Sequence, residues 1–170
     1  MGTTRLSPLV RVELRYSDEQ PPDAEREWIL TDADAAKVVS QLIGTCVQEV
    51  VIVLHIDAKN RLVSYHEVGR GGVSACPVLL REVFAGAVHT SAHGIVLAHN
   101  HPSGETAPSA EDVELTNRVI DAGELLGIPL IDHVIVVRGG AHFSFRGNGM
   151  LSSKRSGPPG GSGLHASGGT

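Results

Sequence analysis

The chain of 170 residues is about one domain long, so it can bury a sizeable core without disulfides or a structural metal. Hydrophobic residues make up 41% of the sequence, which excludes an intrinsically disordered chain. The net charge is −5 and no run of Lys or Arg occurs, which disfavours direct binding to nucleic acid.

Hydrophobic periodicity predicts strands and helices along most of the chain. In chain order, the predicted elements are a strand at 9–15, a helix from Thr31 to Gly44, strands at 49–56 and 61–68, a helix from Pro77 to Val88, a strand at 94–98, a helix from Ser109 to Gly127, and strands at 129–137 and 142–146. The segment 49–56 is apolar throughout, which is typical of a central strand covered on both faces. Turn residues at 57–60 predict a hairpin, so we expect a mixed sheet flanked by helices in one α/β domain.

Composition divides the chain into three segments. We expect residues 1–30 to form a strand and loop that pack on the domain, and residues 31–147 to form the domain itself. Residues 148–170 are rich in Gly, Ser and Pro and are predicted to be a disordered tail.

The two cysteines, Cys46 and Cys76, are far apart in the sequence, which favours reduced thiols over a disulfide framework. The N-terminus lacks the basic region and apolar run of a signal peptide. No apolar segment approaches the roughly 20 residues that span a bilayer. These features predict a cytoplasmic protein that does not insert into a membrane.

Residues 95–112 gather metal-binding side chains where a predicted strand meets a predicted helix. Residues i and i+2 of a strand point to the same side, so His99 and His101 can bind one ion. Asp112 lies in the first turn of the helix, where the helix dipole favours a carboxylate, and is the third candidate ligand. Three ligands leave a fourth tetrahedral position for water, as in catalytic zinc sites, and the imidazoles favour Zn²⁺. Ser109 and Asp112 taken alone would equally be a helix cap.

The pattern His99-x-His101-Pro102-x6-Ser109-x-x-Asp112 resembles the JAMM motif of MPN-domain metallopeptidases. The flanking text, LAHNHPSGETAPSAEDVELTNRVIDAGELLGIPLIDHVIVV, is similar to the RadC family of that superfamily, in a short form without its N-terminal helical module. The resemblance covers roughly residues 9–151. It implies one MPN domain layered like a cytidine deaminase, one Zn²⁺ per chain, and metal-assisted hydrolysis of a peptide or isopeptide bond.

The resemblance also implies a glutamate base on an earlier strand, four residues before the first Gly of a Gly-Gly-Val segment. That position is Glu67, for which a solvent-exposed glutamate at the end of a strand is the alternative. Glu82 is a second candidate, expected instead to lie on a helix surface or in packing. In this interpretation Glu67 accepts a proton from the zinc-activated water and Ser109 hydrogen-bonds the oxyanion.

The remaining candidate residues receive structural interpretations. Cys76 could reach the metal as an inhibitory fourth ligand, but an ordinary thiol is favoured. Asp132 and His133 are adjacent in a buried predicted strand and are assigned a structural role, with each satisfying the other or the backbone.

The resemblance implies a peptide or protein substrate, such as the tail of a ubiquitin-like protein that adds as a strand to a sheet edge. One competing function is a DNA-repair or recombination factor whose MPN domain serves as an interaction module. Another is a catalytically silent scaffold, but such proteins usually lack the ligands that this chain retains. A zinc cytidine deaminase would need His-x-Glu and Pro-Cys-x-x-Cys motifs, which the sequence lacks.

Overall fold

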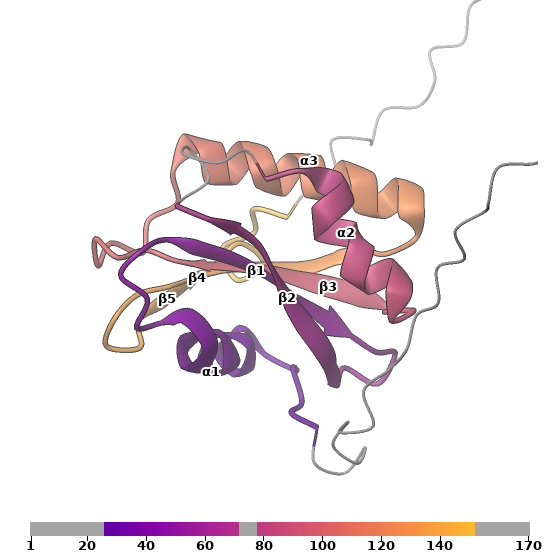
Figure 1. Ribbon diagram of the computed structural model, residues 1–170, viewed down its shortest axis with the longest axis horizontal. Coiled ribbons are helices and arrows are strands. Elements are labelled where there is room, and N and C mark those ends of the chain that lie inside the picture. Colours follow the sequence, from indigo (N-terminus) through magenta and orange to yellow (C-terminus); the bar gives the residue numbers. More distant parts are fainter. Residues whose placement is uncertain (1–25, 72–77, 152–170) are drawn as a thin grey trace, which may run out of the picture.

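A computed structural model describes residues 26–71 and 78–151. In this part of the chain, a five-stranded mixed sheet lies between helix α1 on one face and helices α2 and α3 on the other (Figure 1). The helices are α1 (Asp32–Ile43), α2 (Leu80–His89) and α3 (Ala110–Leu126), and the strands are β1 (Val50–Ile56), β2 (Leu62–Arg70), β3 (Gly94–Asn100), β4 (Leu130–Val136) and β5 (His142–Ser144). The predicted fold class, a single α/β domain, is confirmed.

The strand order is β2-β1-β3-β4-β5. β1 pairs antiparallel with both β2 and β3, β3 pairs parallel with β4, and β4 pairs antiparallel with the short β5. Because β1 and β3 are antiparallel, the beginning of β1 and the end of β3 lie at the same end of the sheet. Val51 is aligned with His99 there, so the predicted metal motif meets the start of β1.

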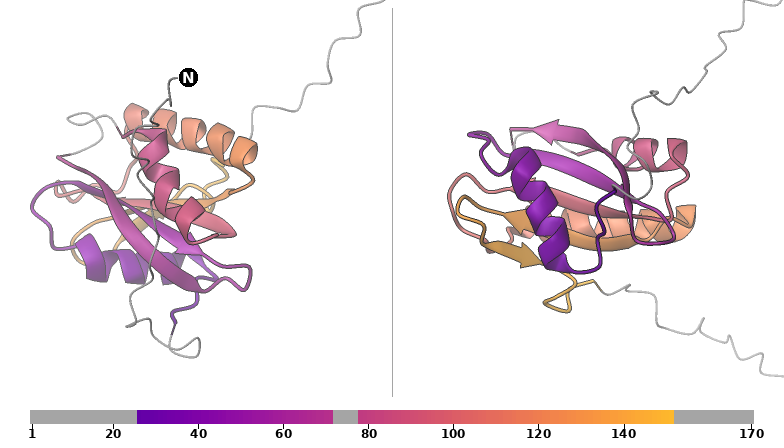
Figure 2. Two further views of the ribbon diagram at one scale, coloured as in Figure 1. Left: turned by 45° about the vertical axis from the view of Figure 1, so that its right-hand side comes forward. Right: turned by 90° about the horizontal axis from the view of Figure 1, so that it is seen from below.

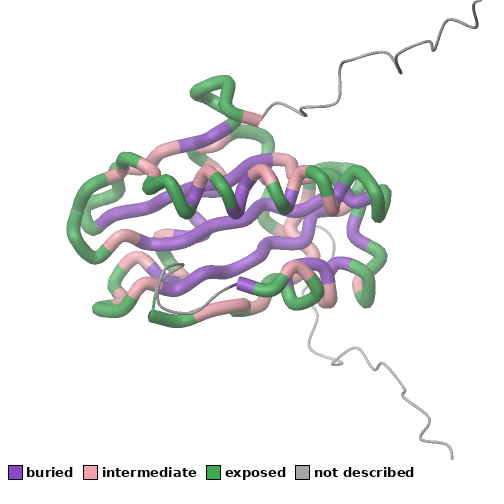
Figure 3. The backbone as a smooth tube through the Cα atoms, turned by 90° about the horizontal axis from the view of Figure 1, so that it is seen from above, coloured by how far each residue is buried: buried purple, intermediate pink, exposed green. Residues whose placement is uncertain are grey.

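The two faces of the sheet form separate hydrophobic cores, because successive side chains of a strand point to opposite faces. The core under α1 includes Ile52, Leu54, Val96, Ala98, Val134 and Val136. The core under α2 and α3 includes Val51, Val53, Ile95, Leu97, Leu115 and Val119. The central strands are buried along their whole length (Figure 3), as the unbroken apolar run of β1 predicted. Figure 2 shows α1 alone on its face of the sheet.

The helix ends follow the predicted caps. At the start of α1, the Thr31 hydroxyl accepts a hydrogen bond from the Asp34 backbone, and the Asp34 carboxylate accepts one from the Thr31 backbone. Gly127 ends α3 at a φ of 69°, in the left-handed region that glycine adopts without steric cost. Within the described residues, no helix combines the length and apolar composition needed to cross a membrane.

Several predicted element ends are corrected by the structure, two of them for clear physical reasons. α2 begins at Leu80 and not at Pro77, because the backbone of Leu79 is still extended. β5 stops at Ser144, short of the predicted end of that strand. The buried Asp132 carboxylate accepts hydrogen bonds from the Ser144 hydroxyl (2.6 Å) and from a backbone N–H in the following turn (2.9 Å), which draws the chain away from the sheet. Asp132 therefore has the structural role that was predicted for it.

The first described residues lie along the β1–β2 hairpin. Trp28 forms a β-bridge with Arg61, and the Ile29 N–H donates to the Asn60 carbonyl at 2.8 Å. The predicted strand at 9–15, Cys76, and the tail after residue 151 lie outside the described residues.

Candidate metal centre

Strand β3 carries two histidines to one end of the sheet. It extends beyond the predicted 94–98 to Asn100, so His99 is a strand residue and His101 follows it directly. Both imidazoles lie on the face covered by α3, and their Nε2 atoms are 3.0 Å apart. Two nitrogens bound to one tetrahedral zinc at 2.0–2.1 Å would be separated by about 3.3 Å, so this spacing is close to that of two ligands of one ion.

Helix α3 supplies a carboxylate to the same point. Asp112 Oδ1 lies 3.3 Å from His99 Nε2, and Asp112 Oδ2 lies 3.6 Å from His101 Nε2. Asp112 also completes a capping box: it accepts hydrogen bonds from the Ser109 N–H (2.8 Å) and the Ser109 hydroxyl (2.6 Å). Capping and metal binding are therefore compatible roles of one residue, and the cap fixes where the carboxylate points.

Asp112 is only 1% exposed, yet it remains a carboxylate at neutral pH. Burial raises its pKa, but the hydrogen bond and charge of His99, together with the hydrogen bonds from Ser109, lower it further than burial raises it. The net result is a pKa held well below its ordinary value. Metals bind carboxylates in the deprotonated form, so this side chain is ready for a cation.

Glu49 completes the cluster and was missed from the sequence. It directly precedes β1, and continuing the β1–β3 register past the Val51–His99 pair sets Glu49 opposite His101 on the same face. One ligand atom each from Glu49, His99, His101 and Asp112 lies within 4.8 Å of every other. The sequence did contain a signal for Glu49, because an acidic residue directly precedes the most apolar predicted strand. Recognising Glu49 as a candidate required knowing that this strand pairs antiparallel with the strand that carries the histidines.

Asn100, the middle residue of the His-Asn-His triplet, holds the segment that contains Glu49. Its side chain points away from the histidines and is 2% exposed. Its Oδ1 accepts from the Val50 N–H at 2.8 Å, and its Nδ2 donates to the carbonyls of Cys46 (3.2 Å) and Gln48 (3.1 Å). One buried amide thus ties β3 to the backbone on both sides of Glu49.

We expect Asn100→Asp to lower the free energy of unfolding of the apo-protein by about 2–3 kcal/mol, because buried partners lose their hydrogen bonds. Aspartate can still accept from the Val50 N–H, but it replaces the Nδ2 donor with an oxygen, which faces the carbonyls of Cys46 and Gln48. Urea denaturation measures the effect. An unfolding free energy equal to that of the wild type would show that Asn100 does not hold this segment.

The structure does not bring the predicted base, Glu67, to the cluster. Glu67 lies on β2, which β1 separates from β3, and is aligned with Ile52 of the core under α1. Its side chain is therefore on the opposite face from His99. There it forms a two-pronged ion pair with Arg70 at 2.7 and 2.9 Å, near the surface. This is the alternative that the sequence left open, an exposed glutamate at the end of a strand.

The second candidate base also lies apart from the cluster. Glu82 is an exposed residue of α2, as expected, and pairs with the neighbouring Arg81 at 3.1 Å.

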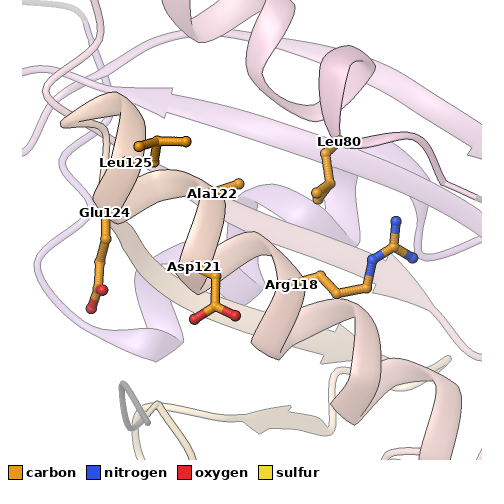
Figure 4. A pocket seen from close by; sticks show the side chains of 6 residues that line it. All are labelled: Leu80, Arg118, Asp121, Ala122, Glu124 and Leu125. Atoms are coloured by element: carbon orange, nitrogen blue, oxygen red, sulfur yellow. The ribbon is translucent and has the colours of Figure 1, made fainter. Parts of the chain in front are cut away.

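A hollow of about 450 Å³ opens beside the cluster. Its lining includes Glu49, His101 and Ser109, together with residues of the loop between β3 and α3. A larger hollow of about 700 Å³ lies between α2 and α3 (Figure 4), but it contains no member of the cluster. Its lining residues are Leu80, Arg118, Asp121, Ala122, Glu124 and Leu125. The smaller hollow is the one that reaches the cluster, through Glu49 and His101.

Comparison with known proteins finds a matching family model and several similar chains. The sequence model of the "RadC-like JAB domain" matches residues 29–150. A UPF0758 protein of Clostridium perfringens is 40% identical over 104 residues, covering 61% of this chain and 46% of the relative. Another, from Trichlorobacter lovleyi, is 46% identical over 104 residues (61% and 45%), and one from Porphyromonas gingivalis is 39% identical over 135 residues (79% and 58%). The chain spans about half the length of these curated relatives.

Proposed function

Because the chain belongs to the family of RadC-like JAB domains, we propose that it is a zinc-dependent hydrolase of peptide or isopeptide bonds. The observation that carries the proposal is the convergence of two imidazoles and two carboxylates from β3, α3 and the start of β1. Nitrogen and oxygen ligands in this number suit Zn²⁺. The hollow beside them gives a substrate access, as a catalytic site requires.

We assign His99, His101 and Asp112 as the zinc ligands. These three are held in place by the end of β3 and by the cap of α3, with 3.0–3.6 Å between their nearest atoms. Three protein ligands leave one coordination position for water or substrate. Glu49 reaches the cluster from the residue just before β1 and is only half-buried in the wall of the hollow. We therefore assign Glu49 as the general base, in the role that the sequence had given to Glu67.

Zinc in such a donor set lowers the pKa of coordinated water to about 7 and polarises a carbonyl, which makes amide hydrolysis feasible at neutral pH. Glu49 accepts the proton of the attacking water and passes it to the leaving amine. The Ser109 hydroxyl donates to Asp112 Oδ2 in the structure and also lines the hollow. Rotation about its Cα–Cβ bond would direct that proton to the oxyanion of the tetrahedral intermediate.

An extended peptide is the substrate form that this end of the sheet fits. β2 is one of the two edge strands of the described sheet, and the residue after it contacts the proposed base, since the Gly71 N–H donates to the Glu49 carbonyl at 2.8 Å. A peptide added along that edge, such as the tail of a ubiquitin-like protein, would run toward the hollow.

Zinc content tests the proposal directly. Wild type reloaded with zinc and desalted is expected to hold about one Zn²⁺ per chain by elemental analysis, whereas the His99→Ala, His101→Ala double variant is expected to hold almost none. His93→Ala is the matched control, because His93 is an exposed histidine just before β3 and should leave the zinc in place. Wild type without stoichiometric zinc, or a double variant that keeps it, would overturn the proposal.

A further inference from the structure

A buried chain of hydrogen bonds lies behind the proposed zinc ligands. His99 Nδ1 lies 2.9 Å from His133 Nε2, and His133 Nδ1 lies 2.6 Å from Thr116 Oγ1. The Thr116 hydroxyl donates to the Asp112 carbonyl at 2.6 Å. His133 is 0% exposed and Thr116 is 1% exposed. The chain connects β3, β4 and α3, and both of its ends are proposed ligands.

The donors and acceptors of this chain fit one direction best. Thr116 has a single hydroxyl proton, and donating it to Asp112 leaves the Thr116 oxygen as an acceptor for His133 Nδ1–H. His133 Nε2 is then the acceptor and takes the Nδ1–H of His99. With Nδ1 engaged as the donor to His133, Nε2 is the nitrogen of His99 that is left to bind a metal, and it faces His101 and Asp112. Reversing the chain would take the Thr116 proton away from the Asp112 carbonyl.

The plane of the His133 ring is set independently of any metal. The ring stacks on Phe145, with centroids 4.7 Å apart and planes 11° apart. Its backbone is fixed on both sides, since its N–H donates to Asp132 Oδ1 (2.7 Å) and its carbonyl accepts from the Phe145 N–H (3.0 Å). The acceptor for His99 is therefore already in place before a cation binds.

We propose that His133, held by Thr116, is a positioning residue that keeps His99 in the tautomer whose Nε2 lone pair faces the metal. This inference rests on the proposed function, because it assumes that the cluster binds zinc. It extends the structural role that was predicted for His133. Metal-binding histidines usually donate their second N–H to a carboxylate, a carbonyl or water, and such partners typically account for a factor of about 10–100 in metal affinity. A neutral imidazole does this without adding another negative charge to a buried site.

The same sheet contains a second histidine pair that provides a matched control. His55 Nε2 lies 3.0 Å from His66 Nδ1, and His66 Nε2 lies 2.8 Å from the Glu82 carbonyl. His55 is also buried, with its Nδ1 2.7 Å from the Ser64 hydroxyl. This pair lies under α2 and shares no residue with the metal-binding cluster. Replacing His55 therefore removes a buried imidazole of similar burial without touching the proposed site.

The experiment is a competition titration of zinc against a chromophoric chelator, at pH 7.5, on apo-protein whose fold is checked by circular dichroism. His133→Phe keeps a ring to stack on Phe145 but removes the acceptor, and is expected to raise the zinc Kd by about 10–100-fold. His133→Gln, which can restore an acceptor for His99, is expected to recover part of that loss. Thr116→Val, which replaces the hydroxyl with a methyl group, tests the same chain with less disturbance and is expected to raise the Kd by a smaller factor. His55→Phe is expected to leave it unchanged.

The outcomes separate this inference from the proposed function. If the wild type binds zinc and both His133→Phe and Thr116→Val bind it equally well, the positioning role is wrong while the zinc site stands. The role is also wrong if His55→Phe weakens zinc binding as much as His133→Phe does, because the effect would then be general destabilisation. Should His133→Phe fail to fold, the comparison of Thr116→Val with Thr116→Ser, which restores the hydroxyl, decides the question. Wild type that binds no zinc would overturn the proposed function and this inference with it.

Discussion

Glu49→Gln is expected to keep its zinc and to lose hydrolysis by about 10²–10⁴-fold, the usual contribution of a general base. Glutamine has nearly the shape of glutamate but cannot accept a proton. The three proposed ligands are unchanged, so metal content should stay near one per chain. The measurement is kcat/KM on a peptide chosen from a cleavage library, with zinc determined on the same sample.

Glu67→Gln is the matched control, since it makes the same chemical change in the same hairpin. Glu67 lies on the face opposite His99 and pairs with Arg70 near the surface. Its replacement is expected to leave kcat/KM unchanged and to cost at most about 1 kcal/mol of stability. If Glu67→Gln abolished hydrolysis while Glu49→Gln did not, the base assignment would be reversed. If Glu49→Gln lost zinc, Glu49 would be a ligand.

Asp112→Asn is expected to weaken zinc binding by more than about 100-fold, beyond the effect of losing an outer partner of a ligand. The carboxylate is buried, and its pKa is held below the ordinary range, so it supplies a full negative charge to the site at neutral pH. Asparagine is neutral and offers a single oxygen. The zinc Kd, measured by chelator competition, reports the loss.

Ser109→Ala separates the ligand role of Asp112 from its capping role. It removes the hydroxyl of the N-cap, which typically costs about 1 kcal/mol of stability, but leaves the Asp112 carboxylate in place. We expect this variant to bind zinc within a few-fold of the wild type and to hydrolyse more slowly for lack of the oxyanion donor. For the Asp112→Asn variant of the preceding prediction, a zinc affinity equal to that of the wild type would show that Asp112 serves only as a helix cap.

The metal motif could be predicted because its geometry is almost entirely local. His99 and His101 share a face because side chains alternate along a strand, and Asp112 is presented by the cap that Ser109 begins. Neither statement depends on distant parts of the chain. The secondary structure and the mixed sheet were also predictable, since unbroken apolar runs and turn residues mark the strands. Within residues 26–71 and 78–151, the errors in secondary structure were confined to element ends such as that of β5, where the distant Asp132 draws the chain into a turn.

Tertiary structure decided which glutamate lies beside the histidines. Glu49 directly precedes β1 and Glu67 lies in β2, at the same end of one hairpin, and the sequence offers no local difference that brings either to the histidines. The order β2-β1-β3 makes β1 the neighbour of the histidine strand, and the register sets Glu49 opposite His101. Strand order and register are long-range properties, and a shift of one residue reverses which face every side chain occupies.

The buried residues that support the cluster were also decided by tertiary structure. Asn100 and His133 each act on residues far away in sequence, the first on the backbone around Glu49 and the second on His99. The sequence by itself determined which residues are candidate ligands, because that depends on local backbone geometry. Only the folded sheet determined which glutamate faces these residues and which buried side chains hold them in place. Those contacts arise from the pairing of strands that are far apart in the sequence.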